Sequence, residues 1–159
     1  ARIQEWLGES IVIESVITQN SKNAALAQAD IDRLDGQWRS ETGSADQPMI
    51  GAVLGTALSE FLAQVKAESE GMYTEIFVMD NRGLNVGQSD VTSDYWQGDE
   101  AKWQKTYLAG PGAVFIDDVG HDESTQTFQA QVSIAIEDPA TRTVIGAVTI
   151  GIDIEQLVN

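Results

Sequence analysis

The sequence contains no cysteine, one histidine and three prolines. Without cysteine the chain can form no disulfide, no thiol nucleophile and no cysteine-ligated zinc site. Because His121 is the only histidine, a metal site with two histidine ligands and a catalytic pair of histidines are excluded as well. We therefore expect no cofactor and no resident metal.

Basic side chains are also scarce, since 9 lysines and arginines stand against 25 aspartates and glutamates, a formal net charge of -16. Such a surface repels nucleic acid and anionic lipid headgroups, which excludes both as partners. No apolar run is long enough to cross a bilayer, and we expect no signal peptide within these residues. The chain opens at Ala1 directly on a helical pattern, which suits a trimmed precursor or a fragment of a longer protein. Any membrane contact is expected only through segments outside this chain.

The 159 residues and the hydrophobic content of 42% fit one globular domain, predicted to be helical over 1–70 and strand-rich over 71–159. An opening helix, interrupted at Asn20–Ser21, is followed by a short second helix. The opening helix carries its apolar side chains on one side: Ile3, Trp6, Leu7, Ile13, Val16 and Ile17. The second helix likewise carries apolar side chains on one side, at Ile31, Leu34 and Trp38.

A third helix is predicted from Pro48 to Val65 as one continuous element, because its apolar residues keep a period of about 3.6 residues. Small residues form a neighbouring strip at Gly51, Gly55 and Ser59. The strip predicts close packing against another backbone of the chain, or a dimer face. A homodimer through the N-terminal helices therefore stays open.

After residue 70 the apolar period changes to two, which predicts antiparallel strands. The expected strands cover 74–79, 84–88, 113–116, 128–137 and 143–153, with His121 to Thr125 as a loop. The sequence thus predicts an α+β domain with a five-stranded antiparallel sheet. The N-terminal helices should cover one face, and the connector between the second and third strands should cover the other.

That connector is unusually rich in aromatic side chains, and it lacks the period of an ordinary core helix. Aromatic walls with polar groups between them enclose small polar or cationic molecules. The residues expected to form a roof over the sheet are Tyr95, Trp96, Trp103 and Tyr107. The short or polar residues expected beneath it are Gln131, Ser133, Ala147, Thr149, Gly151 and Asp153. The alternative is that this face of the sheet is simply exposed to solvent.

Two acidic features need separate interpretations. Asp153 ends an apolar strand, where it could receive an ammonium group or cap the turn over 154–157, and both could hold at once. The acidic run over 117–123 lacks the ligand spacing of a calcium loop, and a solvated hairpin tip explains it better than a metal. Neighbouring carboxylates such as Asp99 and Glu100 point in different directions and do not form an acid–base pair. With no phosphate loop and no serine elbow present, we expect no enzyme activity.

The order of elements and several local strings resemble the Cache family of extracytoplasmic sensor domains. The segments that carry this resemblance are 77–83, 99–107, 110–112 and 145–154. It implies a PAS-like sheet preceded by long helices, on the outer side of chemoreceptors, histidine kinases or cyclic-dinucleotide enzymes. It also implies binding of a small metabolite.

In the members that bind amino acids, the connector carries an Arg-any-Trp-Tyr string, and an aspartate at the strand end receives the ligand's amino group. By this resemblance Trp103 matches the tryptophan and Asp153 the aspartate, while the arginine and tyrosine positions fall on Ala101 and Gln104. Lys102 or Lys105 could replace the arginine as a point charge of different geometry. The expected ligand is thus a small polar or amine-bearing metabolite with a cationic end.

The leading hypothesis is a periplasmic or otherwise extracytoplasmic sensing domain of a bacterial signal-transduction protein, without catalytic activity. Two alternatives belong to other classes of protein. One is a free-standing periplasmic solute-binding protein, and the other is a dimerisation module that binds no ligand.

Overall fold

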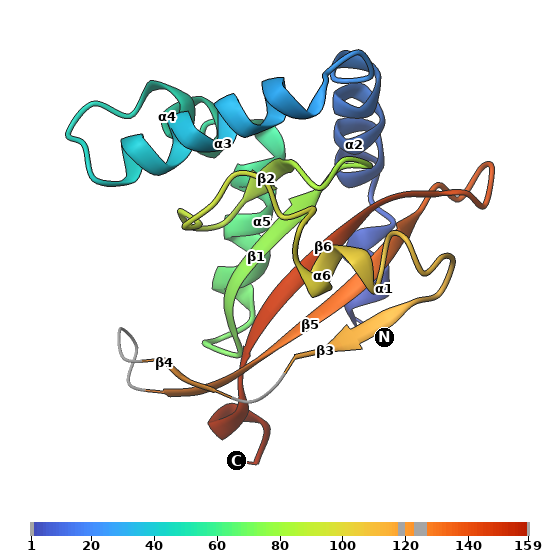
Figure 1. The fold of residues 1–159 in the computed structure, drawn as a ribbon. Helices are drawn as coiled ribbons and strands as arrows, with labels where there is room; N and C mark the ends of the chain where they lie inside the picture. The colour runs from blue at the N-terminus through green and yellow to red at the C-terminus, as the bar shows by residue number, and fades with distance from the viewer. Residues whose placement is uncertain (1, 118–119, 123–126, 159) are drawn as a thin grey trace.

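The computed structural model describes residues 2–117, 120–122 and 127–158, which form an α+β fold with helices first and strands after them (Figure 1). The N-terminal helices are α1 (Arg2–Leu7), α2 (Ser10–Lys22), α3 (Gln28–Thr42), α4 (Pro48–Leu54) and α5 (Ala57–Glu68). The remaining elements are β1 (Tyr73–Met79), β2 (Asn85–Gln88), α6 (Ala101–Gln104), β3 (Val114–Ile116), β4 (Gly120–Asp122), β5 (Thr127–Glu137), β6 (Val144–Asp153) and the 3₁₀ turn η1 (Ile154–Leu157). The predicted fold class is confirmed.

The predicted opening helix is two helices, and its break lies elsewhere than expected. Glu9 has an extended backbone, with φ of -63° and ψ of 142°, which separates α1 from α2. The predicted interruption at Asn20–Ser21 is wrong, because α2 continues to Lys22. The Asn20 side chain instead ties α2 to the sheet: its amide donates to the Ile145 carbonyl at 2.8 Å and accepts from the Asn81 N–H at 2.9 Å.

The predicted third helix is also divided, into α4 and α5, whose axes are bent by 65°. Thr56 leaves the helical conformation and caps α5, since its hydroxyl accepts from the Ser59 N–H at 3.2 Å. The apolar period passes through the break unchanged, which is why it concealed the bend. Among the described residues no single helix has the length and apolar content of a membrane span, whereas α4 and α5 reach both only when taken together.

The small-residue strip packs at one position out of three. A Cβ atom on Gly51 would meet nothing within 4 Å, and Gly55 is exposed, so close backbone packing is wrong at both glycines. Ser59 is buried, and its hydroxyl donates to the Val53 carbonyl at 2.6 Å and accepts from the Gln88 N–H at 3.0 Å. The dimer face stays a prediction.

The sheet is antiparallel throughout, with the order β2-β1-β6-β5-β3 and with β4 paired to β5. It has six strands in the described part of the chain, one more than predicted. The additional strand β4 occupies the start of the expected loop His121 to Thr125, and residues 123–126 lie outside the described residues.

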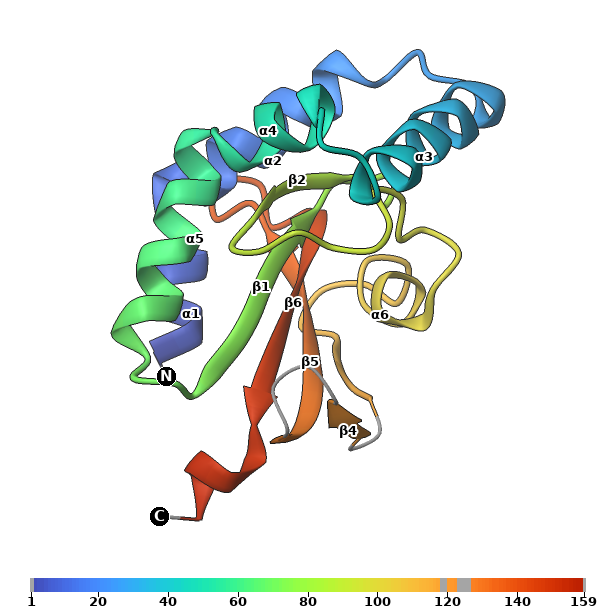
Figure 2. The ribbon, with the colours of Figure 1, turned by 90° about the vertical axis from the view of Figure 1, so that its left-hand side faces the viewer.

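The two faces of the sheet differ because side chains alternate along each strand. On one face β1, β5 and β6 bury apolar side chains against α2 and α5, and this is the main core. Its central members are Val12, Val16, Leu58, Leu62, Ile76, Val78, Ile136, Val148 and Ile150. Figure 2 shows α1, α2 and α5 on this helix side and α6 on the opposite side, which we call the connector side.

Candidate functional site

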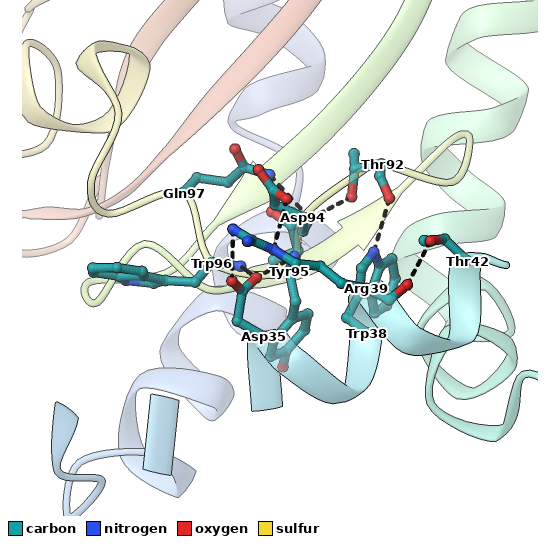
Figure 3. Close-up of polar contacts among 10 residues, drawn as sticks. Asp35, Trp38, Arg39, Thr42, Thr92, Asp94, Tyr95, Trp96 and Gln97 are labelled. Atoms are coloured by element: carbon teal, nitrogen blue, oxygen red, sulfur yellow. Dashed lines mark hydrogen bonds and ion pairs between the residues drawn. The ribbon is translucent and has the colours of Figure 1, made fainter. Parts of the chain in front are cut away.

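The connector between β2 and β3 divides into a first half, residues 89–98, and a second half, residues 99–110. The first half is bound to α3 (Figure 3). One Asp35 oxygen accepts the backbone N–H groups of Tyr95 and Trp96, each at 3.0 Å. The Arg39 guanidinium joins the Asp35 and Asp94 carboxylates, with N···O distances of 3.0 Å. These contacts fix the first half of the connector to the helical part of the fold.

Tyr95 lies in the core of this contact. Its ring stacks on Trp38 with centroids 5.4 Å apart, and the Trp38 indole donates to the Thr92 carbonyl at 2.8 Å. Burial, and secondarily the negative charge of Asp80, raise the pKa of the Tyr95 phenol from 10.0 to about 12. Tyr95 therefore belongs to a separate apolar cluster and does not join a roof above the sheet.

Trp96 closes the β1–β2 hairpin. Its indole donates to the Arg82 carbonyl at 2.8 Å, and its backbone pairs with Leu84. Gly98 is needed beside it, because a Cβ atom there would collide with the Trp96 ring and with the Arg82 carbonyl. Figure 3 shows Trp96 pointing away from Tyr95 and Trp38. Like Tyr95, it is held by the hairpin and α3 region.

The second half of the connector supplies the aromatic cover of the sheet. Trp103, on α6, packs with Phe77 and Met79 of β1 and Ala147 of β6, and Tyr107 stacks on it at 5.1 Å. The Trp103 indole also donates to the Asp80 carbonyl at 3.0 Å. Of the predicted roof residues, the structure brings Trp103 and Tyr107 together on the connector side.

One row of residues crosses four strands beneath α6. Pairing places Phe77 opposite Thr149, Thr149 opposite Ser133, and Ser133 opposite Phe115. We call this set the hydroxyl row. The two hydroxyls are buried and hydrogen-bonded to each other at 2.8 Å, so the row is covered in this structure.

Two lysines lie over the ends of the hydroxyl row. The Lys102 ammonium lies 5.4 Å from the centre of the Phe77 ring and 2.9 Å from the Glu100 carboxylate, and its side chain is only 16% exposed. The Lys105 ammonium lies 4.8 Å from the centre of the Phe115 ring. Ammonium groups on aromatic faces are attracted by the ring electrons. The two lysines thus lie over the aromatic ends of the hydroxyl row, and the charge of Lys102 is paired with Glu100.

The connector side becomes more polar and more exposed away from α6. Gln131 donates to the Glu75 carboxylate at 2.9 Å, and the Thr74 hydroxyl donates to the side-chain amide oxygen of Gln129 at 3.1 Å. A bulge between Tyr73 and Glu75 brings Thr74 to this side. The expected hollow above Gly151 is filled, because Thr74 and Glu75 atoms occupy the space where its Cβ would stand.

Asp153 caps η1, as one of its two interpretations predicted. Its carboxylate accepts from the Glu155 N–H at 3.0 Å, and its side chain is buried. It stands six residues along β6 from Ala147, which Trp103 contacts, a separation of about 20 Å along a strand. A small ligand therefore cannot contact Trp103 and Asp153 together in this arrangement. Contact of any of these residues with a ligand stays a prediction.

Sequence reasoning missed Phe77, Phe115 and Glu75 as members of this side. The signal was present in the strand alternation, since Phe77 and Glu75 share the parity that β1 presents to the connector. It was hidden because aromatic residues in a strand predict core equally well.

The acidic hairpin tip offers no metal site that the structure describes. Asp118 and Glu123 of the predicted run lie outside the described residues, and His121 packs edge-on against Phe128 with ring centres 5.3 Å apart. Within the described ranges no group of three or more histidine and carboxylate side chains could hold a metal ion.

No family model and no curated protein matches the chain. Two solved structures share its fold. The extracellular domain of the histidine kinase rpHK1S-Z16 is 13% identical, with a TM-score of 0.51, and the match covers 98% of this chain and 56% of that one. The ligand-binding domain of the Pseudomonas aeruginosa PAO1 amino acid chemoreceptor PctC, in complex with GABA, is 14% identical, with a TM-score of 0.50 and coverage of 98% and 62%. This chain thus spans less than two thirds of either domain, and it shares the fold of both.

Proposed function

We propose that this chain is a ligand-sensing module of a bacterial signal-transduction protein, located outside the cytoplasm and without catalytic activity. The support is a fold shared with the extracellular domain of a histidine kinase and with a chemoreceptor domain that binds GABA. The aromatic and charged side chains of the connector side add to it. The output of such a protein would lie in other segments of the chain.

The placement of Lys102 and Lys105 above the hydroxyl row is the observation that carries this proposal. Lysine is expensive to cover, and Lys102, whose side chain is 16% exposed, is held there by the Glu100 carboxylate and the Phe77 ring. A ligand carboxylate could share this ammonium group with Glu100. A ligand carboxylate or other acidic group would meet these ammonium groups and the buried hydroxyls. We propose that this end of the site binds the acidic group of the ligand.

The cationic end of the ligand would face Glu75. Glu75 is paired with Gly151, two residues along β6 from Thr149, so its row lies about 7 Å from the hydroxyl row. A carboxylate that already accepts from Gln131 can accept further hydrogen bonds from an ammonium group. The spacing favours an amine-bearing metabolite whose charged ends lie several ångströms apart. Asp153 would contribute negative charge at longer range.

Ligand contact would reach the N-terminal helices through Asp80. The Trp103 indole is bound to the Asp80 carbonyl, and the Asp80 carboxylate accepts from the Gln19 amide of α2 at 3.0 Å. A shift of α6 on closing over a ligand would therefore bias the position of α2. This is the route by which we propose that binding is signalled.

The test is calorimetric titration with the series glycine, β-alanine, γ-aminobutyrate and δ-aminovalerate, preceded by a thermal-shift screen of amine metabolites. We expect affinity to rise with the separation of the two charged ends. Lys102→Met and Glu75→Gln should each weaken binding about tenfold or more, because each removes a charge that faces the ligand.

Lys22→Met is the matched control, since Lys22 is exposed at the end of α2. The proposal is wrong if no amine raises the melting temperature and if Trp103→Ala and Asp153→Ala leave both the fold and any signalling unchanged. If Lys102→Met and Lys22→Met lowered the affinity equally, Lys102 would not be part of the binding site.

A further inference from the structure

A cavity of about 530 Å³ lies on the helix side, between α1, α5 and the start of β1. Small-molecule sites in proteins occupy roughly 300–1,000 Å³, so its size suits a metabolite. Its walls include three aromatic side chains, Trp6, Phe61 and Tyr73. Figure 2 shows α1 and α5, which carry most of its lining residues, on the opposite side of the sheet from α6.

Three carboxylates line the same cavity: Glu5, Glu9 and Glu68. None of the three has an ion-pair partner among the residues that the structure describes. Glu68 accepts a hydrogen bond from Gln64 at 2.9 Å, and nearby Lys66 is directed to Asp90, with an N···O distance of 2.8 Å. The cavity therefore combines aromatic walls with negative charge that no ion pair among the described side chains, which do not include that of Arg2, neutralises.

Trp6 adds an unused hydrogen-bond donor. Its indole N–H is buried and finds no acceptor in the described part of the chain. Buried donors in folded proteins are nearly always paired, so an unpaired one needs an explanation. Trp6 therefore brings to the cavity a ring face and an indole N–H that the described part of the fold leaves unpaired.

We propose that this cavity binds a small amphipathic organic cation, an ammonium group attached to an aromatic or branched apolar body. The apolar body would fill the space between Trp6, Phe61 and Tyr73, where ring faces also attract the cation. The ammonium group would lie toward Glu5, Glu9 and Glu68. This site is independent of the function proposed for the connector side.

A second copy of the chain is a poorer occupant of the same cavity. A two-fold contact through α1 and α5 would bring Glu5, Glu9 and Glu68 toward their own equivalents. Like charges brought together in this way repel, and the whole chain already carries a net charge of -16. Charge complementarity therefore favours a cation.

The experiment follows the ¹⁵N-labelled indole signals of the intact chain during titration with phenethylamine, with neutral phenethyl alcohol and with anionic 3-phenylpropanoate. Trp6 reports the helix-side cavity, and Trp103 reports the connector side. We expect saturable shifts of the Trp6 signal with the amine, and binding about tenfold weaker for the alcohol and weaker still for the anion. The same result is expected in a Lys102→Met/Glu75→Gln background, which separates it from the other site.

The double variant Glu5→Gln/Glu9→Gln should lose most of the preference for the amine over the alcohol. Its control, Glu14→Gln/Glu60→Gln, changes the net charge equally at exposed positions away from the cavity and should keep the preference. The proposal is overturned if millimolar amine leaves the Trp6 signal unmoved, or if all three probes bind alike. It is also overturned if Trp6 shifts with protein concentration alone, which would identify a second copy as the occupant.

Discussion

Trp38 and Tyr95 stack at 5.4 Å where the first half of the connector meets α3, and Trp103 and Tyr107 stack at 5.1 Å in its second half. The geometry of the two pairs is alike, but their surroundings are not. Trp38 is fully buried, whereas Trp103 retains 9% exposure and Tyr107 is only half-buried. Stacking alone thus does not tell a core pair from a binding surface.

The two halves of the connector differ in how they are hydrogen-bonded to the rest of the fold. Asp35 and Arg39 of α3 bind the backbone and the Asp94 carboxylate of the first half. In the described residues, α6 has one side-chain hydrogen bond to a residue outside the connector, from Trp103 to Asp80. The first half is therefore tied to the helical part of the fold by more side-chain contacts than α6 is, and we propose the second half as the part that responds to a ligand.

The largest expected difference between the halves is in the free energy of unfolding. Trp38→Ala should lower it by about 3–5 kcal/mol, because it leaves a large cavity and an unpaired Thr92 carbonyl. Trp103→Ala should cost less, about 1–3 kcal/mol, because α6 can settle onto the sheet. Urea unfolding measures both values, and equal losses would contradict the distinction.

Alkaline pH gives a second test of the first half. The phenol of Tyr95 has a pKa near 10 in the unfolded chain and about 12 in the fold, so its full contribution to stability is present below pH 10. As the pH rises from about 10 to about 12 the unfolded chain ionises first, and about 2 to 3 kcal/mol should be lost.

The measurement for this test is the stability of the wild type against Tyr95→Phe across that pH range. Comparison with the variant cancels the titration of all other groups. A difference that stays constant with pH would show that the Tyr95 phenol is not held neutral by burial.

The smallest expected effect concerns the attachment to α3. Asp35→Ala leaves the N–H groups of Tyr95 and Trp96 without their acceptor and removes one of the two carboxylates that hold the Arg39 guanidinium, and should cost about 1–2 kcal/mol. Asp32→Ala is the control on an exposed position of the same helix and should change stability by less than about 0.5 kcal/mol.

Amide hydrogen exchange sharpens this prediction. Asp35→Ala should speed exchange at the Tyr95 and Trp96 amides and leave the Trp103 amide, which bonds to Glu100 within the connector, unchanged. Faster exchange through both halves would show that the connector moves as one unit.

Local patterns predicted the elements well where one strong signal acted alone. The alternation in β5 and β6 predicted both strands and the apolar side that packs on α2 and α5. The apolar period of residues 48–65 failed to predict the break at Thr56, because such a period shows which side of a helix is buried and not whether the helix axis is straight. The strip of small residues failed to predict the surroundings of Gly51 and Gly55, because small residues permit close packing without requiring it.

The amino-acid sequence by itself determined the α+β class, the acidic surface, and the presence of an aromatic connector over a sheet whose side chains there are short. Only the tertiary structure decided which aromatics serve the core and which face the sheet, and that Asp153 lies about 20 Å along β6 from the residue beneath Trp103. The reason is that composition and period act over a few neighbouring residues. The partner of a tryptophan is set by which distant strand or helix the fold brings beside it.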